Sequence, residues 1–92
     1  MEQPANVEEQ VVIIERRGPH PDCRSVSLLV TTHATYTREE AYRLVREQPG
    51  ALYIRVGAER MDLAPAAIGD LRYVRTATFD TPGDALLGTG KG

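Results

Sequence analysis

The segment TREEAYRLVREQPG at 37–50 constrains the fold most, because it predicts one short helix in a chain whose other segments alternate like strands. Thr37 can cap the helix, and Glu40, three residues later, completes a capping box. Three apolar residues follow at spacings of three and four and form a short stripe: Ala41, Leu44 and Val45. The closing Pro-Gly pair ends the helix after about three turns. A helix this short is marginal alone in water, so its stripe must dock on a sheet.

Two strands are expected before the helix. The run 10–17 is apolar on both sides, which is typical of a central strand. The run 24–32 alternates, which predicts one buried and one exposed side. Its expected inward residues are Val26, Leu28 and Val30, and its expected outward residues are Ser25, Ser27 and Thr31. We expect the two strands to pair antiparallel across the loop 18–23.

Three strands are expected after the helix. The runs 51–56 and 60–68 read as a hairpin across a turn at 57–59, and Pro65 either stops the ladder or marks a sheet edge. A turn at 69–70 leads into the last strand, 71–78.

The resulting order is strand, strand, helix, strand, strand, strand. It predicts an α+β domain of two layers, in which a mainly antiparallel sheet of about five strands carries one helix on one face. The chain of 92 residues has room for one domain. We expect this domain at 10–88, a disordered N-terminal segment at 1–9 and a flexible tail at 89–92.

Composition narrows the class of protein. The formal net charge of -2 argues against strong nonspecific binding to nucleic acid, and no apolar run approaches the length of a membrane span. The first residues are acidic, unlike a signal peptide, and the single cysteine agrees with a reducing compartment. We expect a cytoplasmic protein without membrane association and without a cofactor.

Residues with catalytic or metal-binding side chains cluster at 20–33, but without a recognised spacing. They are His20, Asp22, Cys23 and His33. A zinc site needs three or four ligands, usually with paired cysteines, and a cysteine nucleophile needs an oriented base. We expect neither a metal site nor cysteine catalysis, and we read 18–23 as a solvent-facing hairpin loop. The glycine-rich 88–92 has no following helix and is not a phosphate loop.

The carboxylates of the second half are Asp62, Asp70, Asp80 and Asp84, and the sequence does not show that any two form an acid/base pair. Asp70, next to Gly69, and Asp80, before Thr81 and Pro82, are expected in turns.

Arginines and tyrosines interleave in the predicted strands 51–56 and 71–78. The candidate binding residues are Tyr53, Arg55, Arg72, Tyr73 and Arg75. Such residues can stack bases or clamp a carboxylate. The favoured alternative is that Arg75 pairs with a neighbouring acid, Asp62 or Asp80, and fixes strand register.

Several short motifs resemble an uncharacterised family of short, mostly bacterial proteins known as a domain of unknown function. The matching pieces are TREEAYRLV at 37–45, LYIRVG at 52–57, RYVRT at 72–76, Asp80 and DALLG at 84–88. The resemblance covers roughly residues 10–88 and departs where Asp84 and Ala85 stand in place of the family's usual Asn. It implies a shared fold and no particular activity.

The preferred functional interpretation is a small, non-catalytic binding or protein-interaction module. It would act through the helix-free sheet face or an exposed edge strand, with a protein partner or as a homodimer. The alternative is single-stranded nucleic-acid binding through an Arg/Tyr sheet face. An enzyme would need a pocket, for which a thin two-layer domain leaves little depth.

Overall fold

This computed structural model describes residues 8–77 and 80–89 of the chain. Within them lie seven strands, one α-helix and two short 3-10 helices. In chain order they are β1 (Glu9–Arg16), η1 (Cys23–Ser25), β2 (Val26–Thr31), β3 (Thr35–Thr37), α1 (Arg38–Glu47), β4 (Leu52–Val56), β5 (Glu59–Asp62), β6 (Ala64–Ile68), β7 (Leu71–Arg75) and η2 (Ala85–Gly88).

The strands form two sheets. The larger has the order β3-β2-β1-β4-β5, and the smaller is the hairpin β6-β7. All pairings are antiparallel except that of β1 with β4, which is parallel over two residue pairs. The predicted α+β class, with a five-stranded and mainly antiparallel sheet, is confirmed.

The strand order differs from the predicted one in three places. The short edge strand β3 was not predicted, and β4 pairs in parallel with β1 as well as antiparallel with β5. The predicted strand 60–68 is two strands, because Leu63 interrupts it: its N–H donates to the Leu52 carbonyl at 3.0 Å, and its side chain is buried. Beyond Leu63 the chain leaves the large sheet, and Pro65 lies in β6, which pairs only with β7 in the described chain.

Helix α1 begins where the sequence predicts. The Thr37 hydroxyl accepts a hydrogen bond from the Glu40 N–H at 3.1 Å, and the Glu40 carboxylate accepts one from the Thr37 N–H at 2.9 Å. This reciprocal capping box satisfies two N–H groups that the helix itself leaves open. Ala41 and Val45 are buried and Leu44 packs against the core, so the predicted stripe is confirmed.

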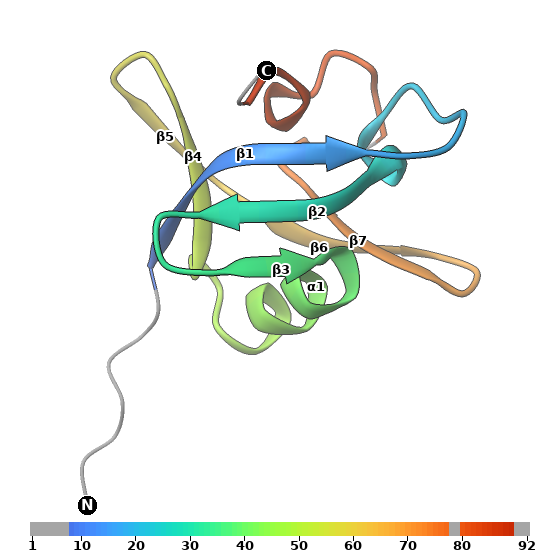
Figure 1. Cartoon of the computed structure of the whole chain (residues 1–92), viewed down its shortest axis with the longest axis horizontal. Helices are drawn as coiled ribbons and strands as arrows, with labels where there is room; N and C mark the ends of the chain where they lie inside the picture. The colour runs from blue at the N-terminus through green and yellow to red at the C-terminus, as the bar shows by residue number, and fades with distance from the viewer. Residues whose placement is uncertain (1–7, 78–79, 90–92) are drawn as a thin grey trace, which may run out of the picture.

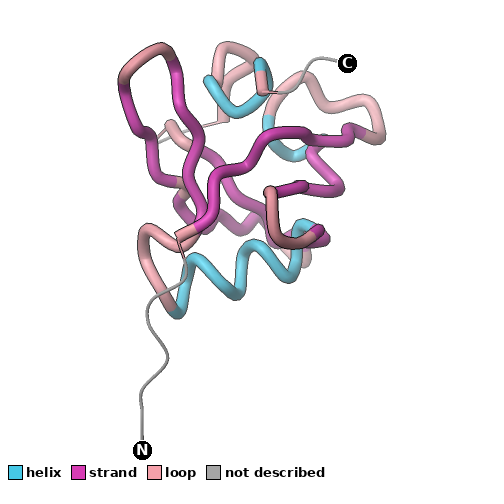
Figure 2. The backbone as a smooth tube through the Cα atoms, turned by 60° about the vertical axis from the view of Figure 1, so that its left-hand side comes forward, coloured by secondary structure: helices cyan, strands magenta, loops and turns pink. Residues whose placement is uncertain are grey.

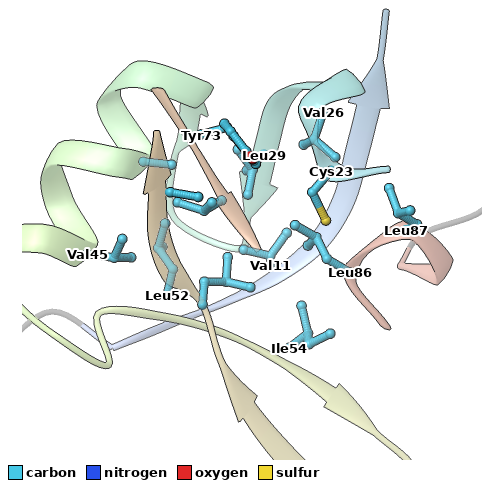
Figure 3. Packing of buried hydrophobic residues seen from close by; sticks show 14 residues of the cluster. Val11, Cys23, Val26, Leu29, Val45, Leu52, Ile54, Tyr73, Leu86 and Leu87 are labelled. Atoms are coloured by element: carbon cyan, nitrogen blue, oxygen red, sulfur yellow. The ribbon is translucent and has the colours of Figure 1, made fainter. Parts of the chain in front are cut away.

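The elements surround one core. In Figure 1 the strands β1, β2 and β3 lie in front of the β6-β7 hairpin, with α1 below them. Figure 2 shows α1 at one end of the strands and η2 at the other. The core side chains come from both sheets and from all three helices (Figure 3); the largest include Tyr73, Leu29, Leu52, Ile54 and Leu86.

The inward and outward sides predicted for 24–32 are largely wrong. Val26 is buried as expected, but so are Leu29 and Thr31, while Leu28 and Val30 are only partly buried. The cause is a shift of register between β1 and β2 after Val26, where one extra residue enters β2. Such a β-bulge reverses the alternation of side chains that follow it.

The β1-β2 loop also differs from its prediction. The strand was expected from residue 24, but Cys23–Ser25 is a 3-10 helix capped by the Asp22 carboxylate. Asp22, Cys23 and Ser25 are buried rather than solvent-facing.

The two later hairpins turn at glycines. Gly57 and Gly69 have φ values of 63° and 58°, a left-handed conformation that favours glycine and suits tight antiparallel turns.

The predicted terminal segments fall mostly outside the described residues. Of the segment 1–9 only Glu8 and Glu9 are described, and Glu9 already belongs to β1, so the strand begins earlier than predicted. Of the tail, Thr89 alone is described, and its N–H donates to the Leu86 carbonyl at 3.1 Å. No helix within the described ranges has the length and hydropathy to cross a bilayer.

Candidate functional site

An uncharged row of side chains crosses the outer face of β1, β2 and β3. We call it the sheet-face patch and define it as Ile13, Leu28, Val30 and Thr35. Strand pairing places Ile13 opposite Val30, and Val30 opposite Thr35. Side chains paired in this way lie about 5 Å apart on one face, so the row is continuous.

The sheet-face patch is open to solvent. Figure 1 looks onto this face, and no described helix or strand lies in front of it. Ile13 is 48% exposed although it lies in the middle of a strand. The other two exposed large apolar residues of the described chain, Val56 and Ile68, stand singly at hairpin ends. A contiguous apolar row, unlike a single apolar residue, marks a binding surface.

Two predicted binding residues, Tyr53 and Arg55, lie on β4, which flanks β1 on the edge opposite to β2. The Arg60 guanidinium lies 4.1 Å from the centroid of the Tyr53 ring and covers one of its faces. Arg60 is held there by Asp62 at 2.7 Å and by Glu8 at 2.9 Å. Arg55 is exposed and lies 5.7 Å from the same ring.

Two further predicted binding residues, Tyr73 and Arg75, take part in a structural cluster. Tyr73 is 0% exposed, and its hydroxyl donates to the Asp80 carboxylate at 2.6 Å. Arg75 pairs with the same carboxylate at 2.7 Å, as the alternative interpretation expected. Burial, together with Asp80, raises the pKa of Tyr73 to about 12, so the phenol stays protonated and remains a donor.

Arg72, the fifth predicted binding residue, lines the groove between α1 and β7. It lies beside Tyr42 of α1, with its guanidinium 5.9 Å from the ring centroid. The five predicted residues therefore belong to separate surfaces or to the interior, and the structure does not bring them together as one Arg/Tyr face. Nucleic-acid binding stays a prediction.

The groove between α1 and β7 contains residues that sequence reasoning missed. Arg72 lines it together with Tyr42, Arg43 and Arg46. The spacing of Tyr42 and Arg46, four residues apart on the helix, places them on one helix face and was a usable signal. No sequence signal joins them to Arg72, which comes from a strand about thirty residues later.

Asp84 ties the C-terminal segment to the end of β7, a role that the sequence did not predict. Its carboxylate is buried and accepts hydrogen bonds from the N–H groups of Thr76, Ala77 and Leu86 and from the Thr76 hydroxyl. Burial acts to raise the pKa of Asp84, but the hydrogen bond from the Thr76 hydroxyl and those from the backbone outweigh it and lower the pKa.

Cys23 is buried next to this network. Burial and the charge of Asp84 raise the pKa of the Cys23 thiol, so the thiolate needed for nucleophilic chemistry does not form at neutral pH. His20 and His33 are exposed, whereas Cys23 is buried. Within residues 8–77 and 80–89, no three His, Cys, Asp or Glu side chains approach closely enough to hold a metal ion.

The buried Asp22 forms a second charged pair. Its two carboxylate oxygens accept hydrogen bonds from the Arg24 guanidinium at 2.9 and 2.8 Å. The hydrogen bonds from Arg24 lower the pKa of Asp22 despite its burial. The arrangement fixes η1 and keeps the Asp22 carboxylate in its ionised form.

Stability is expected to fall in acid because of Asp22 and Asp84. Both pKa values are lower in the folded chain than the ordinary value of 3.8, so their contribution is complete above about pH 4 to 5 and is lost as pH falls through the folded pKa values. The free energy of unfolding should therefore fall as the pH is lowered below this range. Urea unfolding at a series of pH values measures it, and an unchanged midpoint down to pH 2 would contradict it. An Asp84→Asn variant should show a smaller loss.

Comparison of the chain with protein-family models, with curated proteins and with solved structures found no match, so the resemblance to the bacterial family stays a prediction.

Proposed function

We propose that this chain is a non-catalytic protein-interaction module that pairs with a second copy of itself through the sheet-face patch. The carrying observation is the position of Ile13, which is half-exposed in the middle of a strand and continuous with Val30 and Thr35. Covering this row would remove apolar surface from water, at about 25 cal/mol per Å².

The absence of charge in the patch favours a second copy as the partner. A two-fold pair brings each residue near its own counterpart, so any charged group at the centre would meet a like charge. The four residues of the sheet-face patch are uncharged, and Glu15, paired with Leu28, lies at its margin. Two sheet faces can pack directly at about 10 Å, and their rows of branched side chains then interdigitate.

The remaining side chains support a binding role over catalysis. The buried carboxylates of Asp22 and Asp84 are held by hydrogen bonds at lowered pKa values, which suits structural acceptors. The buried Cys23 thiol is protonated. A general acid or base would instead need a pKa near neutral and access to substrate.

The Ile13→Glu substitution is expected to abolish self-association, because it places two like charges in the centre of the paired faces. The dimer dissociation constant should rise at least about tenfold. Sedimentation velocity or light scattering over a range of protein concentrations measures it. Circular dichroism should show that the variant stays folded, since the side chain is already half in water.

Ile68→Glu is the matched control. Ile68 has the same exposure of 48% but stands at the end of the β6-β7 hairpin. The Ile68→Glu substitution should leave the dimer intact. A wild-type chain that is monomeric at the highest concentration reached, or equal weakening by both substitutions, would reject the proposal.

A further inference from the structure

A groove of about 500 Å³ runs between α1 and β7, away from the sheet-face patch. This volume lies within the range of roughly 300 to 1,000 Å³ that is usual for small-molecule sites. Six side chains line it: Glu39, Tyr42, Arg43, Arg46, Glu47 and Arg72.

The three arginines of the groove have unused donors. In the described part of the chain, Arg43, Arg46 and Arg72 form no ion pair with a carboxylate. Arg72 is also held in place, because one of its terminal nitrogens, Nη1, donates to the Gly69 carbonyl at 2.7 Å and to the Leu71 carbonyl at 3.4 Å. Its other guanidinium nitrogens remain for a ligand. Guanidinium groups of this kind pair with phosphate through two parallel hydrogen bonds.

Tyr42 lies between two of these arginines. The Arg46 and Arg72 guanidinium groups are 6.0 and 5.9 Å from the centroid of its ring. The ring packs partly against the core and keeps part of its surface in the groove. A partly exposed aromatic ring next to planar guanidinium groups offers a stacking surface for a nucleobase.

The two glutamates of the groove favour a single nucleotide over a longer nucleic-acid strand as the ligand. Glu39 and Glu47 lie one helical turn before and after Arg43 and line the same groove. A polyanion that continued along the helix would meet them, whereas one phosphate needs only the arginines between them. The overall charge of -2 likewise disfavours a polymer.

From these contacts we infer that the α1-β7 groove binds one nucleotide, with the base stacked beside Tyr42 and the phosphate held by the three arginines. The ribose hydroxyls can donate to Glu39 or Glu47. The site shares no residue with the sheet-face patch, so each proposal can fail without the other.

Adenosine 5′-monophosphate is the probe, titrated into the full chain and followed by NMR of the backbone amides and of the arginine Nε–H groups. The expected result is saturable binding with shifts at Tyr42, Arg43, Arg46 and Arg72. The substitution Arg46→Gln should weaken binding by about tenfold, the loss expected for one charge-assisted contact. The Tyr42→Leu variant should weaken adenosine monophosphate more than inorganic phosphate.

Arg55→Gln is the matched control, because Arg55 lies 5.7 Å from the Tyr53 ring in a similar pair on another surface. It should bind the probe as the wild type does. Absence of binding, or weakening by Arg55→Gln and not by Arg46→Gln, would overturn the inference. Equal affinity for inorganic phosphate would overturn the stacking role of Tyr42. Affinity that rises with the length of an oligonucleotide would replace the single nucleotide by a strand.

Discussion

Replacing Asp84 with alanine is expected to lower the free energy of unfolding by about 3 to 5 kcal/mol, a large part of the stability of a small domain. The carboxylate satisfies three backbone N–H groups and one hydroxyl in a site where Asp84 is only 5% exposed. Without it these donors stay buried with no partner, which costs about 1 to 3 kcal/mol for each group that water does not reach. Urea unfolding followed by circular dichroism measures the change.

The control for this prediction is Asp70→Ala. Asp70 lies exposed in the turn between β6 and β7, and its loss should change stability by no more than about 0.5 kcal/mol. The Asp84→Asn variant should fall between the two, because an amide keeps one acceptor but turns a donor toward the other N–H groups. An Asp84→Ala chain as stable as the wild type would show that the hydrogen bonds from Thr76, Ala77 and Leu86 to Asp84 do not stabilise the fold.

The second large effect is expected for Asp80→Ala, at about 2 to 4 kcal/mol. Asp80 accepts from the buried Tyr73 hydroxyl and pairs with Arg75, whose side chain is 22% exposed. Removing the carboxylate leaves the Tyr73 hydroxyl in the core without its acceptor, and deprives Arg75 of this ion pair. Thermal and urea unfolding both report the loss.

The Asp62→Ala variant provides the comparison for an exposed ion pair. Asp62 pairs with Arg60 at 2.7 Å, but its side chain is 55% exposed. Solvent screens such a pair, so its removal should cost about 1 kcal/mol or less. Equal effects of the two substitutions would remove the case for a structural Tyr73-Asp80-Arg75 cluster and return Tyr73 and Arg75 to the candidate binding residues.

Features that depend on a few neighbouring residues were predictable from the sequence. The start of α1 follows from Thr37 and Glu40, which satisfy each other within four residues. The turns at Gly57 and Gly69 follow from backbone angles that glycine adopts easily. The pairing of Arg75 with a nearby acid was foreseen as the structural alternative, and Asp80 is that acid.

Features that depend on distant segments were not predictable. The bulge after Val26 turned Leu28 and Val30, both expected in the core, onto the outer face, where they form half of the sheet-face patch. Register is decided between two strands, so one strand's pattern cannot reveal such a shift. The α1-β7 groove likewise required Arg72 to meet a helix face across the fold.

The role of Asp84 shows the same limit. Its partners Thr76 and Ala77 are eight and seven residues away, just beyond the end of β7, and no local sequence pattern joins them to Asp84. The five residues named as candidate binding residues were dispersed by the two-sheet arrangement, and the sheet-face patch proposed instead consists of other residues.

The interruption at Leu63 has a consequence for how the molecule unfolds. Leu63 alone separates β5, which belongs to the large sheet, from β6, which belongs to the small one. The Leu63 N–H donates to the Leu52 carbonyl and fixes this junction to β4. A shift of register in one sheet would therefore also shift the strands of the other. Unfolding of either sheet should then unfold the whole domain in one cooperative transition.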